Sequence, residues 1–346
     1  MKQSAGEMKL ADEQPSEPRA SGAEAFDERA VVIDESTALV GIVHGVDKGH
    51  GRPAVVLINA GFLHRVGPNR LNTDLARKLG EEGFCSIRID ISGLGDSGPR
   101  TDVSDNLELV STDLDRAMDF LEHEHGYRRF VLMGLCSGAY DTLRKAEHDE
   151  RVIGLVNLDG TGYRTARFYI HHVLFHLLPR SLEAWRWQRL WKRYRDSRRQ
   201  GRNHDDAQAI ESGSAQRAGF MSLLAFTDLS REQSGQLIEK LASRGVKMHF
   251  VFSGGVSGYY NYHGQFDDTF RDFDFRGMVS HRYFPDNDHL NMLQIHRDAV
   301  HRDIVDWAVR SFGIASPVGC DAQSGRGDDA QFGRGDAQTP SGERKV

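Results

Sequence analysis

Cysteine is scarce in this chain of 346 residues, which also lacks long apolar runs and a strong net charge. Its three cysteines, Cys85, Cys136 and Cys320, are too few and too widely spaced for a disulfide framework or a Cys-x-x-Cys metal site. No stretch approaches the roughly 20 consecutive apolar residues that a membrane span needs. The formal net charge of -6 disfavours general nucleic-acid binding. We therefore expect a globular protein in which each cysteine is interpreted singly.

The two ends of the chain lack apolar periodicity. Residues 1–28 and 315–346 are rich in small, polar and charged residues, so we expect a disordered leader and a disordered tail. The opening residues, Met-Lys-Gln-Ser-Ala-Gly-Glu, contain no apolar core of a signal peptide. A cytoplasmic location is the resulting expectation.

Between these ends, apolar runs rich in β-branched residues alternate with helical patterns. The helical patterns fall near residues 69–81, 105–124, 137–147 and 292–312. The apolar runs, of which the first two predict a hairpin and the others buried strands, fall at 30–33, 38–43, 53–58, 84–90, 130–133, 152–158, 246–252 and 282–285. This order is typical of a mostly parallel central sheet flanked by helices. We therefore predict an α/β fold whose core spans 29–160 and 244–314.

Residues 161–243 interrupt the alternation, because they contain no convincing strand pattern. An insertion after the sixth strand predicts a helical lid over the carboxyl ends of the strands, where open α/β sheets bind ligands. From Arg180 to Arg202 this segment holds nine basic residues, two acidic ones and several tryptophans. Either its aromatic face packs on the sheet edge and the arginines are solvated, or it binds an acidic carrier protein, a phosphorylated substrate or an anionic membrane surface.

The strongest local motif is the turn Gly134-Leu135-Cys136-Ser137-Gly138, which joins a predicted strand to a predicted helix. A residue held in a strained strand-to-helix turn needs small neighbours, and glycine stands two before and two after Cys136. Such a turn presents the thiol clear of the sheet and directs the N–H of Ser137 at the carbonyl oxygen under attack. Cys136 is therefore the candidate nucleophile.

This turn and three further motifs, in the same order along the chain, resemble the α/β-hydrolase superfamily and its Gly-x-Cys-x-Gly nucleophile elbows. The further motifs are Ile58-Asn59-Ala60-Gly61-Phe62, the turn from Asp90 to Ser97, and Pro285-Asp286-Asn287-Asp288-His289. The stretch from Gly61 to Ser97 is also similar to bacterial serine-aminopeptidase-like hydrolases. The order of elements from about residue 30 to residue 312 fits the superfamily as well.

The resemblance implies a site built around Cys136 as the nucleophile. It assigns His289 as the general base and acid, since this histidine follows the last predicted strand in an Asp-His pair. It assigns the N–H groups of Phe62 and Ser137 as the oxyanion hole. His64 and Arg65 stand beside that loop as candidates to bind a substrate carboxylate or phosphate, with anchoring of the loop as the alternative.

The acid of the triad departs from the family pattern. After the seventh strand, where the acid usually stands, the sequence reads Ser253-Gly254-Gly255-Val256 and offers no carboxylate. Asp159, directly after the sixth strand, is the best substitute, and Asp267 and Asp268 are poorer ones. A structural role of Asp159 as a helix or turn cap stays open.

The thiol at position 136 bears on the substrate class. A thiolate is more nucleophilic than a hydroxyl and is also a better leaving group, so an adduct whose own leaving group is poor collapses backwards. We therefore predict a hydrolase that acts on a small-molecule or carrier-bound ester, lactone or thioester through an acyl-Cys136 intermediate, without a metal or an organic cofactor. Two alternatives stay open: an acyltransferase, as similarity to polyhydroxyalkanoate synthases implies, and a non-catalytic binding module.

Overall fold

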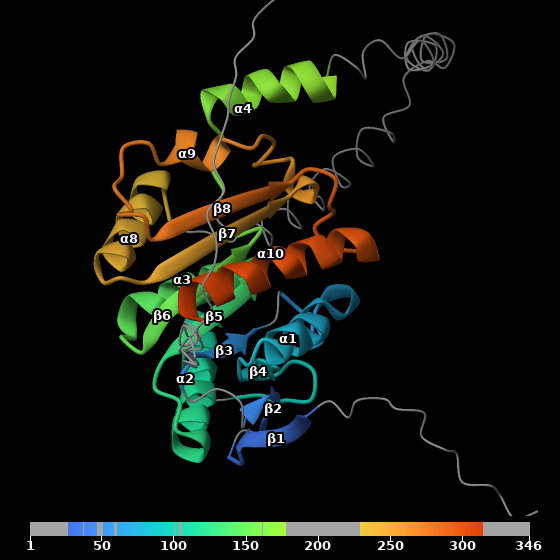
Figure 1. Ribbon diagram of the computed structural model, residues 1–346, viewed down its shortest axis with the longest axis vertical. Helices are drawn as coiled ribbons and strands as arrows, with labels where there is room; N and C mark the ends of the chain where they lie inside the picture. The colour runs from blue at the N-terminus through green and yellow to red at the C-terminus, as the bar shows by residue number, and fades with distance from the viewer. Residues whose placement is uncertain are drawn as a thin grey trace, which may run out of the picture. The chain divides into compact units, whose positions relative to one another are not determined.

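The computed structural model describes residues 27–36, 38–46, 51–58, 61–100, 102–103, 106–160, 162–177 and 229–313 (Figure 1). Most of the predicted leader, the Arg- and Trp-rich segment and the whole of the predicted tail lie outside these residues. The predictions made for them therefore stay predictions.

The described chain forms one mixed sheet in the strand order β1-β2-β4-β3-β5-β6-β7-β8 (Figure 1). β2 runs antiparallel to both of its neighbours, β1 and β4, whereas every other pair of neighbours is parallel. The strands are β1 (Glu28–Asp34), β2 (Leu39–His44), β3 (Ala54–Leu57), β4 (Ser86–Ile89), β5 (Phe130–Leu135), β6 (Val152–Leu158), β7 (Lys247–Ser253) and β8 (Val279–Phe284). The predicted opening hairpin and the predicted mostly parallel sheet are both confirmed.

Helices cover both faces of this sheet. On one face α1 (Leu71–Glu81) contacts α10 (Gln294–Phe312), and on the other α3 (Ser137–His148) contacts both α2 (Asn106–His125) and α8 (Arg231–Ser243). Shorter helical elements are η2 (Pro68–Arg70), α4 (Ala166–His171), η3 (His172–Leu177), η4 (Gly254–Val256) and α9 (Gln265–Thr269). No helix among the described residues combines the length and the apolar character that crossing a membrane requires.

Two separate apolar cores follow from the alternation of side chains along the buried strands. In β3, Ala54 and Val56 join the core that also contains side chains of α2, α3 and α8. Val55 and Leu57 join the other core, together with side chains of α1 and α10. A parallel strand buried on both faces therefore has to be a continuous apolar run, and that is how its sequence reads.

The predicted lid, residues 161–243, is described only at its two ends. α4 and η3 follow β6 at one end, and α8 stands at the other. α8 buries Leu237, Ile238 and Leu241 in the core shared with α3, so it packs in the same helical layer as α3. Its start is sharply defined, because the hydroxyl of Ser230 accepts from the N–H of Gln233 while the Gln233 side chain accepts from the Ser230 N–H. Side chains of the predicted lid segment are thus found in the apolar core from α8 onward, and the predicted boundaries of the lid stay a prediction.

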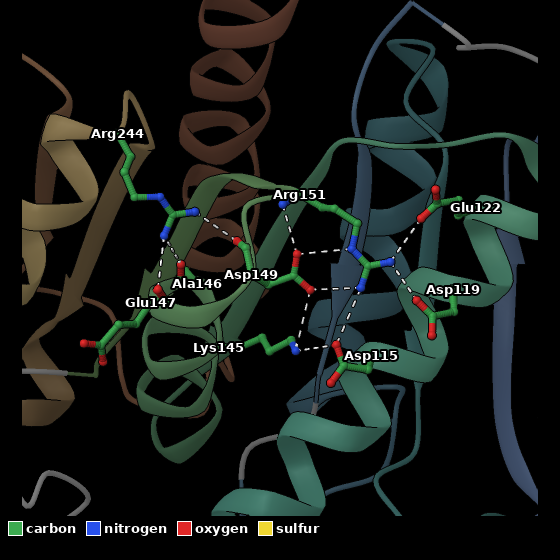
Figure 2. Close-up of polar contacts among 9 residues, drawn as sticks. All are labelled: Asp115, Asp119, Glu122, Lys145, Ala146, Glu147, Asp149, Arg151 and Arg244. Atoms are coloured by element: carbon green, nitrogen blue, oxygen red, sulfur yellow. Dashed lines mark hydrogen bonds and ion pairs between the residues drawn. The ribbon is translucent and has the colours of Figure 1, made fainter.

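A network of ion pairs connects the amino-terminal end of β6 to α2 and α3 (Figure 2). The guanidinium of Arg151 donates to Asp149 at 2.9 Å, and to Asp119 and Glu122 of α2 at 2.6 and 3.1 Å. Lys145 of α3 joins the same group through Asp149 at 3.6 Å. The network lies at the amino-terminal edge of the parallel strands, opposite the edge at which ligands bind such sheets.

Candidate active site

Cys136 occupies the single residue between β5 and α3, with φ 58° and ψ -117°. A positive φ is strained for a residue with a side chain, and such strain persists only where neighbouring structure enforces it. Here the Cys136 N–H donates to the carbonyl of Leu158 in the adjacent strand β6 at 2.8 Å. The thiol therefore stands at the amino-terminal end of α3.

The first glycine of the elbow, Gly134, has a steric cause. A Cβ atom on Gly134 would lie only 2.2 Å from the backbone carbon and oxygen of Gly138. The end of β5 and the first turn of α3 are thus in direct backbone contact, and a side chain at position 134 does not fit between them. The predicted reason for the glycines, that the turn needs room, agrees with this geometry.

Asp159 and His289 meet beside this elbow. Asp159 directly follows β6, and His289 lies in the connection from β8 to α10. The Nδ1 atom of His289 is 2.8 Å from Oδ2 of Asp159, whose side chain is only 3% exposed. The structure thus brings together the three residues that were predicted as nucleophile, base and acid from positions far apart in the sequence.

A serine at the end of β7 holds the Asp159 carboxylate. The N–H of Ser253 donates to Oδ1 of Asp159 and its hydroxyl donates to Oδ2, each at 2.6 Å. The Tyr259 hydroxyl donates to the Asp159 carbonyl at 2.7 Å. Sequence analysis missed both partners. The only signal was that Ser253 ends the seventh strand, where the family usually places its acid.

The surroundings of His289 favour its protonated form. Burial lowers its pKa, but hydrogen bonds to Asp159 and Cys136 and the charges of these two side chains outweigh burial and raise the pKa to about 10. Because Nδ1 faces Asp159, Nε2 is the atom available to Cys136. At neutral pH the ring is therefore an imidazolium between a carboxylate and the sulfur.

The loop after β3 lies against the amino-terminal end of α3. The N–H of Gly61 donates to the hydroxyl oxygen of Ser137 at 2.8 Å. Gly61 has a φ of 53°, which glycine adopts without strain. Its neighbour Phe62 is 88% exposed. The two predicted oxyanion residues, Phe62 and Ser137, are thus neighbours across this contact.

Arg65 forms ion pairs with two carboxylates of the next loop, Asp90 and Asp96. Its N–H donates to Asp90 Oδ1 at 2.6 Å, and its guanidinium contacts the fully buried Asp90 and also Asp96, at 2.7 Å. A Cβ on Gly95 would lie 2.2 Å from Asp90 Oδ2, which explains a glycine in that turn. These contacts favour the loop-anchoring alternative for Arg65. His64 accepts from the Gly67 N–H through its own carbonyl, at 2.9 Å.

The other positions considered for the acid make different contacts. Val256, at the usual acid position, is buried in an apolar core. Asp267 lies 2.9 Å from Nε2 of His281, and Asp268 accepts from the Tyr262 hydroxyl at 2.7 Å. Cys85 is fully buried, as a packing role predicts. Within the described ranges, no group of three or more His, Cys, Asp or Glu side chains has the arrangement of a metal site.

Comparison with solved structures identifies the fold as that of α/β hydrolases. An esterase of Pyrococcus furiosus matches with a TM-score of 0.50 at 12% identity, over 83% of this chain and 91% of its own. The α/β hydrolase GrgF of a Penicillium species matches with a TM-score of 0.48 at 15% identity, over 84% of this chain and 99% of its own. A dienelactone hydrolase of Anabaena variabilis matches with 0.44 at 15% identity, over 82% and 98%. No protein-family model matches the chain, and no curated protein sequence does.

Proposed function

We propose that this protein is a cysteine-dependent hydrolase of esters or thioesters that works through an acyl-Cys136 intermediate. The observation that carries the proposal is the hydrogen-bonded row of Asp159, His289 and Cys136, with the cysteine held at a positive φ on the elbow. The esterase fold of the structural neighbours agrees with it.

In the first half-reaction, Nε2 of the His289 imidazolium already holds the proton of the Cys136 thiol, and the thiolate sulfur attacks the substrate carbonyl carbon. The carbonyl oxygen becomes an oxyanion that accepts from the N–H groups of Phe62 and Ser137. The tetrahedral adduct then collapses, and His289 gives its proton to the departing alcohol or thiol. A thioester between the acyl group and Cys136 remains.

In the second half-reaction, water replaces the departed group. His289, now neutral at Nε2, takes one proton of the water while its oxygen attacks the acyl carbon. The second adduct expels the sulfur as thiolate and releases a carboxylic acid. The Asp159 carboxylate accepts a hydrogen bond from His289 and stabilises its imidazolium in each half.

Activated acyl groups suit this chemistry better than amides. The thiolate leaves more easily than an amide nitrogen, so an amide adduct returns to substrate unless the nitrogen is first protonated. The alternative of a non-catalytic binding module depended on the missing acid after β7. The hydrogen bond between His289 and Asp159, which follows β6, weighs against that alternative.

A panel of 4-nitrophenyl esters and acyl thioesters tests the proposal. We expect turnover by the wild-type protein, loss of turnover in Cys136→Ala, and retention in Cys85→Ala, in which the other described cysteine is removed from the apolar core. Turnover that survives Cys136→Ala would refute the assignment of the nucleophile. Absence of turnover across the whole panel would refute the proposed hydrolase function.

A further inference from the structure

Two neighbouring hollows, with volumes of about 520 and 460 Å³, lie along α4 and share Arg167 and His171 in their walls. The first is also lined by Ile170, Leu174 and Arg271. The second extends to Gly254 and Pro285, the residues that directly follow β7 and β8. We refer to the two together as the α4 cleft. It opens at the carboxyl-terminal edge of these strands, the edge that also carries Asp159.

A buried tyrosine holds the cationic wall of the cleft in place. The guanidinium carbon of Arg167 lies 5.0 Å from the centre of the Tyr262 ring, and the His171 ring stacks on Tyr262 with centroids 4.9 Å apart. Tyr262 is only 4% exposed, and its hydroxyl lies 2.7 Å from the Thr165 hydroxyl. Because Arg167 and His171 are four residues apart on a helix, they present the same face.

The described lining carries a positive charge. Its single carboxylate is Asp268, which accepts from the Tyr262 hydroxyl at 2.7 Å and lies 3.2 Å from Arg271 and 3.6 Å from Arg167. Two guanidinium groups against one carboxylate leave one cationic charge in excess. Ile170 and Leu174, both well exposed, add apolar surface beside it. The cleft therefore complements an anion attached to an apolar segment.

The cleft shares a wall with the His289 loop. The N–H of Gly255 donates to the carbonyl of Asn287 at 3.1 Å. A Cβ on Gly255 would lie 2.2 Å from the backbone nitrogen of His289, so these two backbones are in direct contact. The turn that lines the cleft at Gly254 thus also contacts the loop that carries His289, the proposed base.

We infer that the α4 cleft binds a phosphate or carboxylate group of the acyl substrate, at a distance from the bond that is cleaved. This inference rests on the proposed function and narrows it to anionic esters and thioesters. Arg167 supplies the main cationic contact, Arg271 reinforces it, and Ile170 and Leu174 cover the apolar segment that leads to the anion.

Two matched substrate pairs test the inference. Butanoyl-coenzyme A and butanoyl-N-acetylcysteamine share the acyl group and the thioester, but only the first carries phosphates. 4-Nitrophenyl hemiglutarate and 4-nitrophenyl butanoate differ in the same way by a carboxylate. We expect a lower KM for the charged member of at least one pair, and Arg167→Gln to raise that KM roughly five- to tenfold, as loss of a partly solvated charge-assisted hydrogen bond implies. The KM of the uncharged member and kcat should change little.

Two variants serve as controls. Arg167→Lys retains the charge and should retain most of the preference, whereas Arg302→Gln removes an exposed arginine of α10 and should change nothing. A response confined to the coenzyme A pair identifies phosphate as the bound group, and one confined to the hemiglutarate pair identifies carboxylate. Equal changes for charged and uncharged substrates in Arg167→Gln, or no preference in the wild type, would overturn the inference.

A binding measurement separates this inference from the proposed chemistry. Calorimetry with the Cys136→Ala variant, with and without Arg167→Gln, measures the affinity for butanoyl-coenzyme A and for 4-nitrophenyl hemiglutarate in the absence of turnover. If Arg167→Gln weakens binding in the Cys136→Ala background, and the protein with Cys136 intact turns over no ester of the panel, the result would support the cleft and refute the hydrolase. Ester turnover by the protein with Cys136 intact, together with equal affinities of the proteins with and without Arg167→Gln, would support the hydrolase and refute the cleft.

Discussion

Replacing Asp159 by asparagine is the most informative single perturbation of the site. The amide keeps the shape of the carboxylate but removes its charge and turns one acceptor into a donor. The carboxylate accepts from the Ser253 N–H at 2.6 Å through Oδ1, and from the Ser253 hydroxyl and His289 through Oδ2. If the amide nitrogen faces His289, two donors oppose each other. If it faces Ser253, it opposes that N–H.

The magnitude follows from the bond that is lost. A hydrogen bond to a charged group contributes about 1.5–3 kcal/mol, and each 1.36 kcal/mol corresponds to about a tenfold change in rate. Asp159→Asn should therefore lower kcat/KM by about 10- to 100-fold. With its nitrogen facing His289, the amide also favours the tautomer of His289 that has its proton on Nε2, and this tautomer is unable to accept the thiol proton of Cys136.

The pH dependence has a definite sign. Burial lowers the pKa of His289, but Asp159 and Cys136 raise it to about 10, so in the wild type the imidazolium needed by the leaving group persists until the pH approaches that value. Without the Asp159 charge this pKa falls. The alkaline limb of the kcat/KM profile should move to lower pH in Asp159→Asn. By the same linkage, the folding stability that the raised pKa contributes is fully present below about pH 6.5 and is lost as the pH rises toward 10.

Steady-state kinetics with 4-nitrophenyl butanoate over about pH 5 to 11 measures both the fall in kcat/KM and the shift of its alkaline limb, because this range brackets the pKa of His289. Asp267→Asn is the matched control, because Asp267 lies 2.9 Å from His281 in a similar pair but is 73% exposed and lies outside the site. The control should behave as wild type. A kcat/KM of Asp159→Asn within about twofold of wild type, with an unchanged profile, would show that Asp159 is only structural.

Three further predictions concern the elbow and the fold. Ser137→Ala removes the hydroxyl that accepts from the Gly61 N–H in the loop after β3. Acylation of Cys136 should therefore slow by about tenfold, whereas its alkylation by iodoacetamide should keep its rate. An equal fall in both rates would contradict the oxyanion role. Gly134→Ala places a methyl group 2.2 Å from the backbone of α3 and should cost about 3 kcal/mol or more in denaturant unfolding, and a wild-type midpoint would refute the steric argument. Arg151→Met removes the network of Figure 2 and should lower the free energy of unfolding by about 1 kcal/mol, with a difference that shrinks in high salt; a salt-independent difference would attribute the loss to packing.

The sequence predicted the sheet well because parallel strands buried on both faces have to be apolar throughout. β5 is buried throughout and β6 at every position but Ile153, and both were predicted close to their observed positions. The boundary of the insertion was harder. The amphipathic pattern of α8 shows that one of its faces is apolar, but it does not say whether that face packs on the core or on a lid.

The site was predicted where a local rule constrains it. Cys136 stands between glycines that a strained turn requires, and His289 follows the last strand. Ser253 had no such signal, because a serine at the end of a strand fits many roles and its contact with Asp159 joins residues 94 positions apart in the sequence. Arg65 shows the opposite limit: its charge suggested a ligand, whereas its contacts with Asp90 and Asp96 favour an anchor.

Detection of the acyl-enzyme tests the central proposal most directly. The wild-type protein is mixed rapidly with 4-nitrophenyl butanoate, quenched in acid and digested, and the peptide that contains Cys136 and Ser137 is sequenced by mass spectrometry. We predict one butanoyl group on the sulfur of Cys136, removable by neutral hydroxylamine as a thioester. A butanoyl group on Ser137, or ester turnover with no adduct on this peptide while deacylation is slowed at low temperature, would contradict the proposed mechanism.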